Sequence, residues 1–126
     1  MKLRIQGNSI RLRLTQAEVQ HIAEGKTVKE HVSFGSGTPV FIYALGVASE
    51  EAALTAHYQG HTMQVVLPPD TAHAWATTDQ VGIEETLPVD GSGALHVLIE
   101  KDFQCLHRSD EEEPDNFPNP LATPAQ

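Results

Sequence analysis

The chain contains few of the residues that form covalent cross-links. Its 126 residues include a single cysteine, Cys105, which excludes an internal disulfide and favours a reducing compartment. No stretch has the length and apolar purity of a membrane span. Charged residues recur near the N-terminus, where a signal peptide would have an apolar core. We therefore expect a cytoplasmic protein that has no contact with a membrane.

Basic residues are also scarce. Eight Lys and Arg stand against 17 Asp and Glu, which gives a formal net charge of −9. Nucleic-acid binding depends on the neutralisation of phosphates, so we expect no nucleic-acid partner. The chain length fits one domain with one core. After His107 the composition changes to acids and prolines, which cannot repay their ordering entropy alone. We predict a single domain over 1–108 and an acidic, proline-rich tail over 109–126.

The hydrophobic periodicity predicts the secondary structure. Alternation with period two predicts about eight short strands, over 2–6, 9–14, 27–34, 39–45, 52–58, 61–67, 81–87 and 95–103. The strand over 39–45 is apolar on both faces, which predicts a central position. Thr15-Gln16-Ala17-Glu18 has the form of a capping box, so we predict a helix over about 16–24. A second short helix is predicted over 71–77, with Asp70 as its N-cap.

These elements predict an α+β fold. We expect one mainly antiparallel sheet of about eight short strands with two short helices, and such a sheet can curl into a partial barrel that hides its edges. We find no internal repeat in the sequence.

Four of the eight basic residues occupy the first predicted hairpin. Gly7-Asn8 suits a two-residue turn with positive φ at the glycine. That register sets Leu3 opposite Leu12 on an apolar face. On the other face it sets cation opposite cation, in the pairs Lys2 with Arg13 and Arg4 with Arg11. Like charges directly opposite each other destabilise a strand pair, so these pairs need an explanation.

Three explanations are open. The side chains can fan apart into solvent, since exposed charges interact weakly. Carboxylates of the same chain can neutralise them, with Glu100 and Asp102 on one strand face or the acidic run 110–115 as candidates. Lastly, the arginine forks can hold a bound anion, either a phosphate or a carboxylate.

A metal site is the second candidate. Cys105 and His107 share a strand face and can ligate a soft metal, with His96 completing the set. His57 and His61 resemble a metal pair, but a hairpin turning at Gln59-Gly60 would place their rings on opposite faces. The sequence carries no HExxH, no glycine-rich phosphate loop and no nucleophile elbow, so we assign no catalytic residue.

Three segments resemble a known family. The opening MKLRIQGNSIRLRLTQAEV, the middle WATTDQVGIE and the ending LIEKDFQCLHRSDEEEPDNFPNPL are together similar to a family of short uncharacterised bacterial proteins, a domain of unknown function. The resemblance implies a bacterial, single-domain protein. That family has no assigned activity, so it implies no site residues.

The leading hypothesis is a non-catalytic cytosolic domain that binds an anionic small molecule or an acidic partner segment. Lys2, Arg4, Arg11 and Arg13 would form the binding surface. One alternative is a metal-binding protein or metal-dependent enzyme that uses Cys105, His107 and His96. The other is a purely structural or interaction protein. The sequence specifies no cofactor and no oligomeric state.

Overall fold

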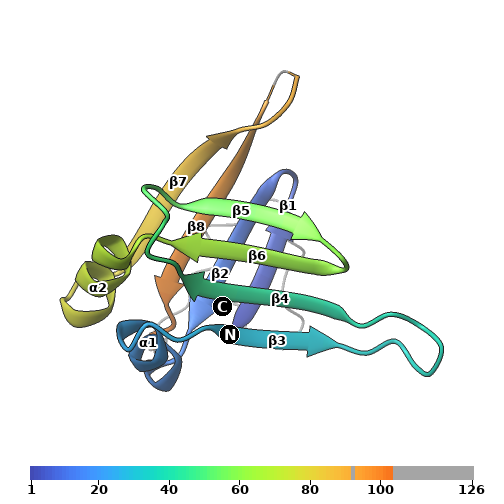
Figure 1. The fold of residues 1–126 in the computed structure, drawn as a ribbon, viewed down its shortest axis with the longest axis horizontal. Helices are drawn as coiled ribbons and strands as arrows, with labels where there is room; N and C mark the ends of the chain where they lie inside the picture. Colours follow the sequence, from blue (N-terminus) through green and yellow to red (C-terminus); the bar gives the residue numbers. More distant parts are fainter. Residues whose placement is uncertain (92, 104–126) are drawn as a thin grey trace, which may run out of the picture.

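A computed structural model of the chain describes residues 1–91 and 93–103 and contains eight strands and two helices (Figure 1). The elements in chain order are β1 (Lys2–Gln6), β2 (Ser9–Leu14), α1 (Gln16–Ala23), β3 (Val28–Val32), β4 (Phe41–Val47), β5 (Thr55–Gln59), β6 (Thr62–Leu67), α2 (Pro69–Thr77), β7 (Gly82–Pro88) and β8 (Ala94–Lys101). The predicted α+β class, with about eight short strands and two short helices, is confirmed.

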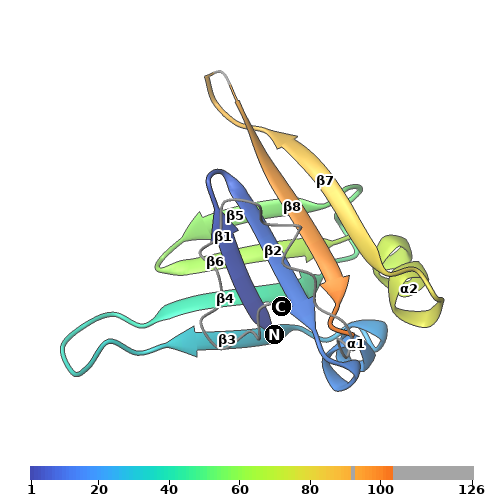
Figure 2. The ribbon, with the colours of Figure 1, turned by 180° about the vertical axis from the view of Figure 1, so that it is seen from behind.

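The strands form two sheets of four, in the orders β1-β2-β8-β7 and β3-β4-β6-β5. Four strand pairs are antiparallel, and the central pairs β2–β8 and β4–β6 are parallel. Figures 1 and 2 show the sheets as two layers, with the strands of one running across those of the other and both helices together at one side. Within the described ranges the strands therefore make two open sheets and no closed barrel. The predicted central position of β4 is confirmed.

The chain is built from two similar units, each with the order strand-strand-helix-strand-strand. The first unit runs from β1 to β4 and the second from β5 to β8, and each sheet takes one hairpin from each unit. β2 in the first unit corresponds to β6 in the second, and β4 corresponds to β8. The parallel pair β2–β8 is therefore equivalent to the parallel pair β4–β6. The expectation of no internal repeat is therefore wrong.

Backbone contacts repeat between the units in detail. The amide of His96 donates to the Asn8 carbonyl at 3.1 Å, and the amide of Ile42 donates to the His61 carbonyl at 3.0 Å. At the other end of the same strand pairs, Asp102 donates to Leu14 at 2.9 Å and Ala48 donates to Leu67 at 3.1 Å. Equivalent residues thus make equivalent hydrogen bonds, and any position in one unit can be compared with its counterpart in the other.

The signal for the repeat lies in the two hairpin turns. Residues 6–9 read Gln-Gly-Asn-Ser and residues 59–62 read Gln-Gly-His-Thr. Gly7 and Gly60 occupy equivalent positions, with φ of +56° and +59°. The register of the first hairpin is as predicted. In the second hairpin the turn is Gly60-His61, one residue later than predicted, so Gln59 pairs with Thr62 and each cross-strand partner is displaced by two residues.

The core lies between the two sheets and against the two helices. It is built from the inward-facing residues of the central strands and one face of each helix, the most deeply buried being Leu12, Leu14, Ile22, Leu45, Val65, Leu67, Trp75, Val97 and Ile99. Val19 and Ile22 of α1 correspond to Ala72 and Trp75 of α2, and all four are buried. The indole N–H of Trp75 donates to the Val81 carbonyl at 3.0 Å, which satisfies its one polar atom.

The two helices begin differently. The predicted capping box of α1 is present, with Thr15 and Glu18 each accepting a hydrogen bond from the other's backbone N–H. By contrast, α2 begins two residues earlier than predicted, with Pro68 as N-cap and Pro69 in the first turn. Proline has φ preset for the first helical turn and lacks the N–H that would need a cap. Asp70 is therefore a first-turn residue and not the cap.

We expect substitution of either turn glycine to lower the stability of the protein by the same amount. An alanine at Gly7 or Gly60 would meet no atom within 4 Å, so its effect is confined to the positive φ, which we expect to lower the free energy of unfolding by about 1 kcal/mol in each case. His61→Gly removes a side chain at φ +63° and should leave the free energy of unfolding unchanged or raise it. Urea unfolding measures all three variants, and an unchanged stability of Gly60→Ala would contradict the assigned turn.

Candidate functional site

The cationic face is formed by Lys2, Arg4, Arg11 and Arg13 on the outer side of the hairpin β1–β2. Lys2 pairs with Arg13 and Arg4 with Arg11, as predicted. Leu3 and Leu12 point the other way, into the core, and this burial fixes the direction of all four cations. Residues i and i+2 of a strand lie on one side, so the four side chains form two rows across neighbouring strands.

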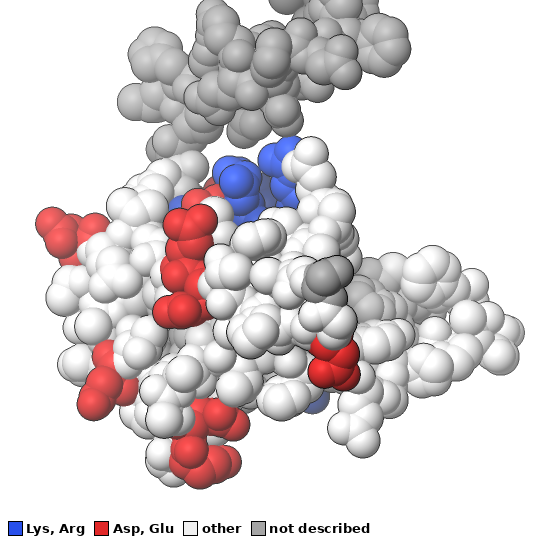
Figure 3. Space-filling model, turned by 90° about the horizontal axis from the view of Figure 1, so that it is seen from above, with Lys and Arg blue, Asp and Glu red and all other residues white. Residues whose placement is uncertain are grey.

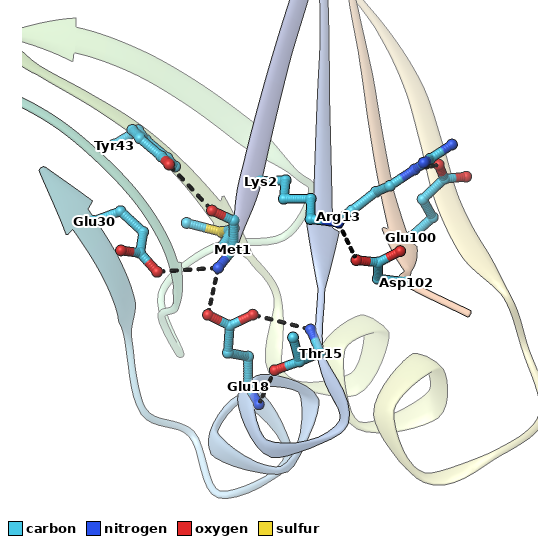
Figure 4. A network of polar contacts seen from close by, with 9 residues as sticks. All are labelled: Met1, Lys2, Arg13, Thr15, Glu18, Glu30, Tyr43, Glu100 and Asp102. Carbon is cyan, nitrogen blue, oxygen red and sulfur yellow. Dashed lines mark hydrogen bonds and ion pairs between the residues drawn. The ribbon is translucent and has the colours of Figure 1, made fainter. Parts of the chain in front are cut away.

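Carboxylates from β8 and the residue after it border this face. Because β8 pairs in parallel with β2, Glu100 lies beside Arg13, with its Oε1 2.7 Å from the Arg13 Nε and 3.5 Å from the Arg11 Nε. Asp102 lies 3.0 Å from the Lys2 Nζ. Figure 4 shows Asp102 and Glu100 approaching the hairpin from the same side. The predicted neutralisation by these two carboxylates is confirmed for these three cations.

Arg4 lies in the row nearer the turn. Its guanidinium donates to the Gln6 side-chain oxygen at 3.4 Å, and Arg4 itself is an exposed residue. Its cross-strand partner Arg11 is more enclosed, with 34% of its side chain exposed.

Basic residues are concentrated on this face. Among the residues that the structure describes, four of the basic residues lie on this face, in a chain whose formal net charge is −9. Figure 3 shows most of the visible Lys and Arg atoms gathered in one place, with Asp and Glu atoms beside them and at several other places on this side of the molecule. The face therefore offers fixed charge and directional N–H donors to an anion.

A second polar cluster lies at the start of β1. The α-ammonium of Met1 donates to Glu18 and, at 3.0 Å, to Glu30, and the Tyr43 hydroxyl donates to the Met1 carbonyl at 3.1 Å (Figure 4). The Met1 side chain packs against the core. Sequence analysis missed this cluster, although an acid at Glu30 between Val28 and Val32 was a signal, because it lies on an otherwise apolar strand face.

This cluster shifts three pKa values. Burial opposes the charge of the Met1 ammonium, but hydrogen bonds to Glu18 and Glu30 outweigh it and raise its pKa. Burial likewise opposes the charge of Glu18, yet its bonds with the ammonium and Thr15 lower its pKa. Burial, followed by the negative charges of Glu30 and Glu18, raises the pKa of Tyr43. These groups hold the first strand in place.

The predicted metal ligands are not brought together in the described residues. His96 lies on the outer face of β8, where its Nδ1 is 3.1 Å from the Thr86 hydroxyl, and it pairs with Ser9. Cys105 and His107 lie outside the described residues. Residues 1–91 and 93–103 contain no group of three His, Cys, Asp or Glu that could hold a metal ion. In the same ranges no helix is long and apolar enough to cross a membrane.

Two hollows lie elsewhere on the surface. One, of about 330 Å³, lies where α1 meets the end of β8, and Gln16, Val19, Lys101 and Phe103 contribute to its lining. The other, of about 410 Å³, is a shallow depression lined by His57, Gln59, Thr62 and Gln64 on the outer side of β5–β6. These four residues are the second-unit counterparts of Arg4, Gln6, Ser9 and Arg11. The same surface thus carries two arginines in the first unit and no Lys or Arg in the second.

Glu100 should stabilise the fold through the two arginines it pairs with. We expect Glu100→Gln to lower the free energy of unfolding by about 1–2 kcal/mol at low salt, because Arg11 and Arg13 lose a charged partner. The loss should shrink as salt is added. Glu84→Gln, on the outer face of β7 opposite Leu98, is the matched control and should change stability by less than about 0.5 kcal/mol. Equal effects of the two substitutions would contradict the pairing.

The Met1 cluster predicts a pH window. The raised pKa of the ammonium means that its contribution is fully present below about pH 8 and is lost as pH rises through that pKa. The lowered pKa of Glu18 means that its contribution is present above about pH 4.3 and is lost as pH falls through that pKa. Glu18→Gln should therefore destabilise the protein most, by about 1–2 kcal/mol, between these limits.

The difference between the wild type and Glu18→Gln should become smaller above pH 8, since only the bond to the Thr15 N–H then remains. Urea unfolding from pH 4 to pH 10 measures this, with Glu24→Gln at the exposed end of α1 as the control. A difference that stays constant across the whole pH range would contradict the ammonium pairing.

The comparisons with known proteins identify a family. A family model described as "Family of unknown function (DUF7009)" matches residues 1–121. No curated protein and no solved structure matches the chain. The matched range covers all eight strands, both helices and the cationic face. The chain therefore belongs to this family of unknown function.

Proposed function

We propose that this domain is a non-catalytic binding module that holds an anionic ligand on the cationic face. Arg4 and Arg11 would donate to phosphate or carboxylate oxygens of the ligand, and Lys2 and Arg13 would extend the field around them. Guanidinium groups supply positive charge and directed N–H donors. This chemistry supports binding as the role of the face.

The comparison of the two units carries the proposal. Thr55, His57, Gln64 and Val66 occupy the positions of Lys2, Arg4, Arg11 and Arg13 in the equivalent hairpin β5–β6. The same backbone thus folds without Lys or Arg at any of these places, so the fold itself does not require the charges. Opposed cations also destabilise a strand pair, and a binding role explains why they are present.

The bordering acids follow the same pattern. Gly46 and Ala48 stand at the positions equivalent to Glu100 and Asp102, so the acids are present only where the cations are. We interpret Glu100 and Asp102 as residues that orient Arg13, Arg11 and Lys2. They reduce the mutual repulsion of the cations.

Substitution of Arg4 and Arg11 tests the proposal. The wild type should bind at least one member of a panel of tripolyphosphate, nucleoside triphosphates, citrate and an Asp/Glu peptide, measured by calorimetry and by the melting temperature. Arg4→Gln with Arg11→Gln should weaken binding at least tenfold, because each charge-assisted hydrogen bond contributes about 1.5–3 kcal/mol. The affinity should also fall as salt is added.

Lys26→Gln with Lys29→Gln is the matched control, since it removes the same charge from another part of the first unit. The affinity of this control variant for the same anion should stay within about twofold of that of the wild type. Glu100→Gln should instead bind more tightly, as it raises the net charge of the face. If no panel member changes the melting temperature of the wild type, or if both double variants weaken binding equally, the proposal fails.

A further inference from the structure

The strand β1 presents its backbone as well as its cations at the edge of a sheet. It is the terminal strand of the sheet β1-β2-β8-β7, and β2 is its partner among the described strands (Figure 2). A two-residue turn makes the flanking pair Gln6–Ser9 a hydrogen-bonded pair, and bonded and non-bonded pairs alternate along an antiparallel ladder. Leu3 and Ile5 take the non-bonded places, so their N–H and C=O groups point away from β2. Each of these residues therefore offers a donor and an acceptor at the outer edge.

The side chains of β1 present different chemistry on the two faces of the sheet. Lys2 and Arg4 lie on the outer face, and 75% of the Lys2 side chain is exposed. Leu3 and Ile5 lie on the opposite, apolar face, where Leu3 packs against the core and Ile5 is 60% exposed. A strand added beside β1 would thus meet cations on one face and an aliphatic side chain on the other.

We propose that β1 binds an extended peptide segment, in which acidic residues alternate with apolar ones, as an additional antiparallel strand. This inference rests on the proposed function and names the class of partner that the cationic face would bind. Main-chain hydrogen bonds to Leu3 and Ile5 would supply affinity, and alternate side chains would supply specificity. Carboxylates would lie opposite Lys2 and Arg4, where opposite charges stabilise a strand pair. Arg4 donates to Gln6, and a guanidinium has several N–H donors, so it can serve a second acceptor.

The cations of β1 oppose pairing with a second copy of this chain. If two β1 strands paired antiparallel through Leu3 and Ile5, the cations of each strand would lie opposite cations of the other. Like charges directly opposite each other destabilise such a pair, and charged side chains commonly protect edge strands from self-association. A partner strand with carboxylates at these positions removes the repulsion. The same charges therefore oppose self-pairing and favour an acidic partner.

The equivalent strand β5 provides an internal comparison. It is the terminal strand of the other sheet, and Ala56 and Tyr58 take the places of Leu3 and Ile5. Tyr58 is 70% exposed, so this edge also presents a large side chain. However, β5 carries no Lys or Arg. An acidic segment should therefore bind to β1 and not to β5, although the two strands have the same backbone pattern.

Backbone methylation of a short peptide tests the inference on the full-length wild type. The parent peptide is Glu-Val-Glu-Val-Glu with blocked ends, and calorimetry measures its affinity. In the proposed strand the valines lie opposite Leu3 and Ile5 and direct their N–H groups toward β1, whereas the glutamates direct theirs away. N-methylation of both valines should therefore weaken binding by about tenfold or more. N-methylation of the first and last glutamates is the matched control and should change the affinity by less than about threefold.

Amide hydrogen exchange of the protein locates the bound peptide. Exchange at the amides of Leu3 and Ile5 should slow when the parent peptide is added, because the new strand would accept hydrogen bonds from them. Exchange at the amides of Ala56 and Tyr58 should stay unchanged. Equal slowing at the two edges, or equal affinities of the parent and both methylated peptides, would overturn the inference.

These outcomes differ from those that would refute the proposed function. If all the peptides bind equally well and Arg4→Gln with Arg11→Gln weakens each of them, the proposed function stands and strand addition is overturned. If tripolyphosphate binds to the wild type and no peptide does, the inference alone is again overturned. If neither tripolyphosphate nor any peptide binds, the proposed function fails and the inference fails with it.

Discussion

The register of the first hairpin is the constraint on which the rest of the site depends. The positive φ of Gly7 closes a two-residue turn, and the burial of Leu12 and Leu14 points the alternate residues outward. A slip of one residue would turn the cations into the core, so the fold cannot tolerate it. Burial of the core residues therefore fixes the direction in which the face points. It does not determine which residue types occupy the face, so Arg and Lys can be present there for binding.

The second unit shows what this backbone does without the charges. Its hairpin β5–β6 has the same turn and the same parallel attachment to a neighbouring strand, yet its outer surface is formed by His57, Gln59, Thr62 and Gln64. Architecture that the two units share, such as the buried helix faces and the turn glycines, serves stability. Features present in only one unit, namely the cations and their bordering acids, are the ones that need a functional explanation.

Local patterns predicted much of the fold. Period-two alternation gave the strands, the capping box gave α1, and Gly7-Asn8 gave the correct register. The predicted turn of the second hairpin was one residue too early. The observed turn contains His61 with positive φ, which a residue other than glycine rarely adopts. A comparison of residues 59–62 with residues 6–9 would have predicted the correct turn. The parallel pairs β2–β8 and β4–β6 join distant segments and leave no local signal, so sequence alone offered Glu100 and Asp102 as candidates but could not place them.

The central claim is that the cationic face binds an anion through Arg4 and Arg11. An NMR titration of the full-length wild type with tripolyphosphate tests it most directly, because the molecule contains its own control. The account predicts that the Nε–H signals of Arg4 and Arg11 shift and reach saturation, while the side-chain signals of His57 and Gln64, at the equivalent places in the other unit, stay unchanged. Equal shifts at both hairpins, or no shift at either arginine up to saturating tripolyphosphate, would contradict it.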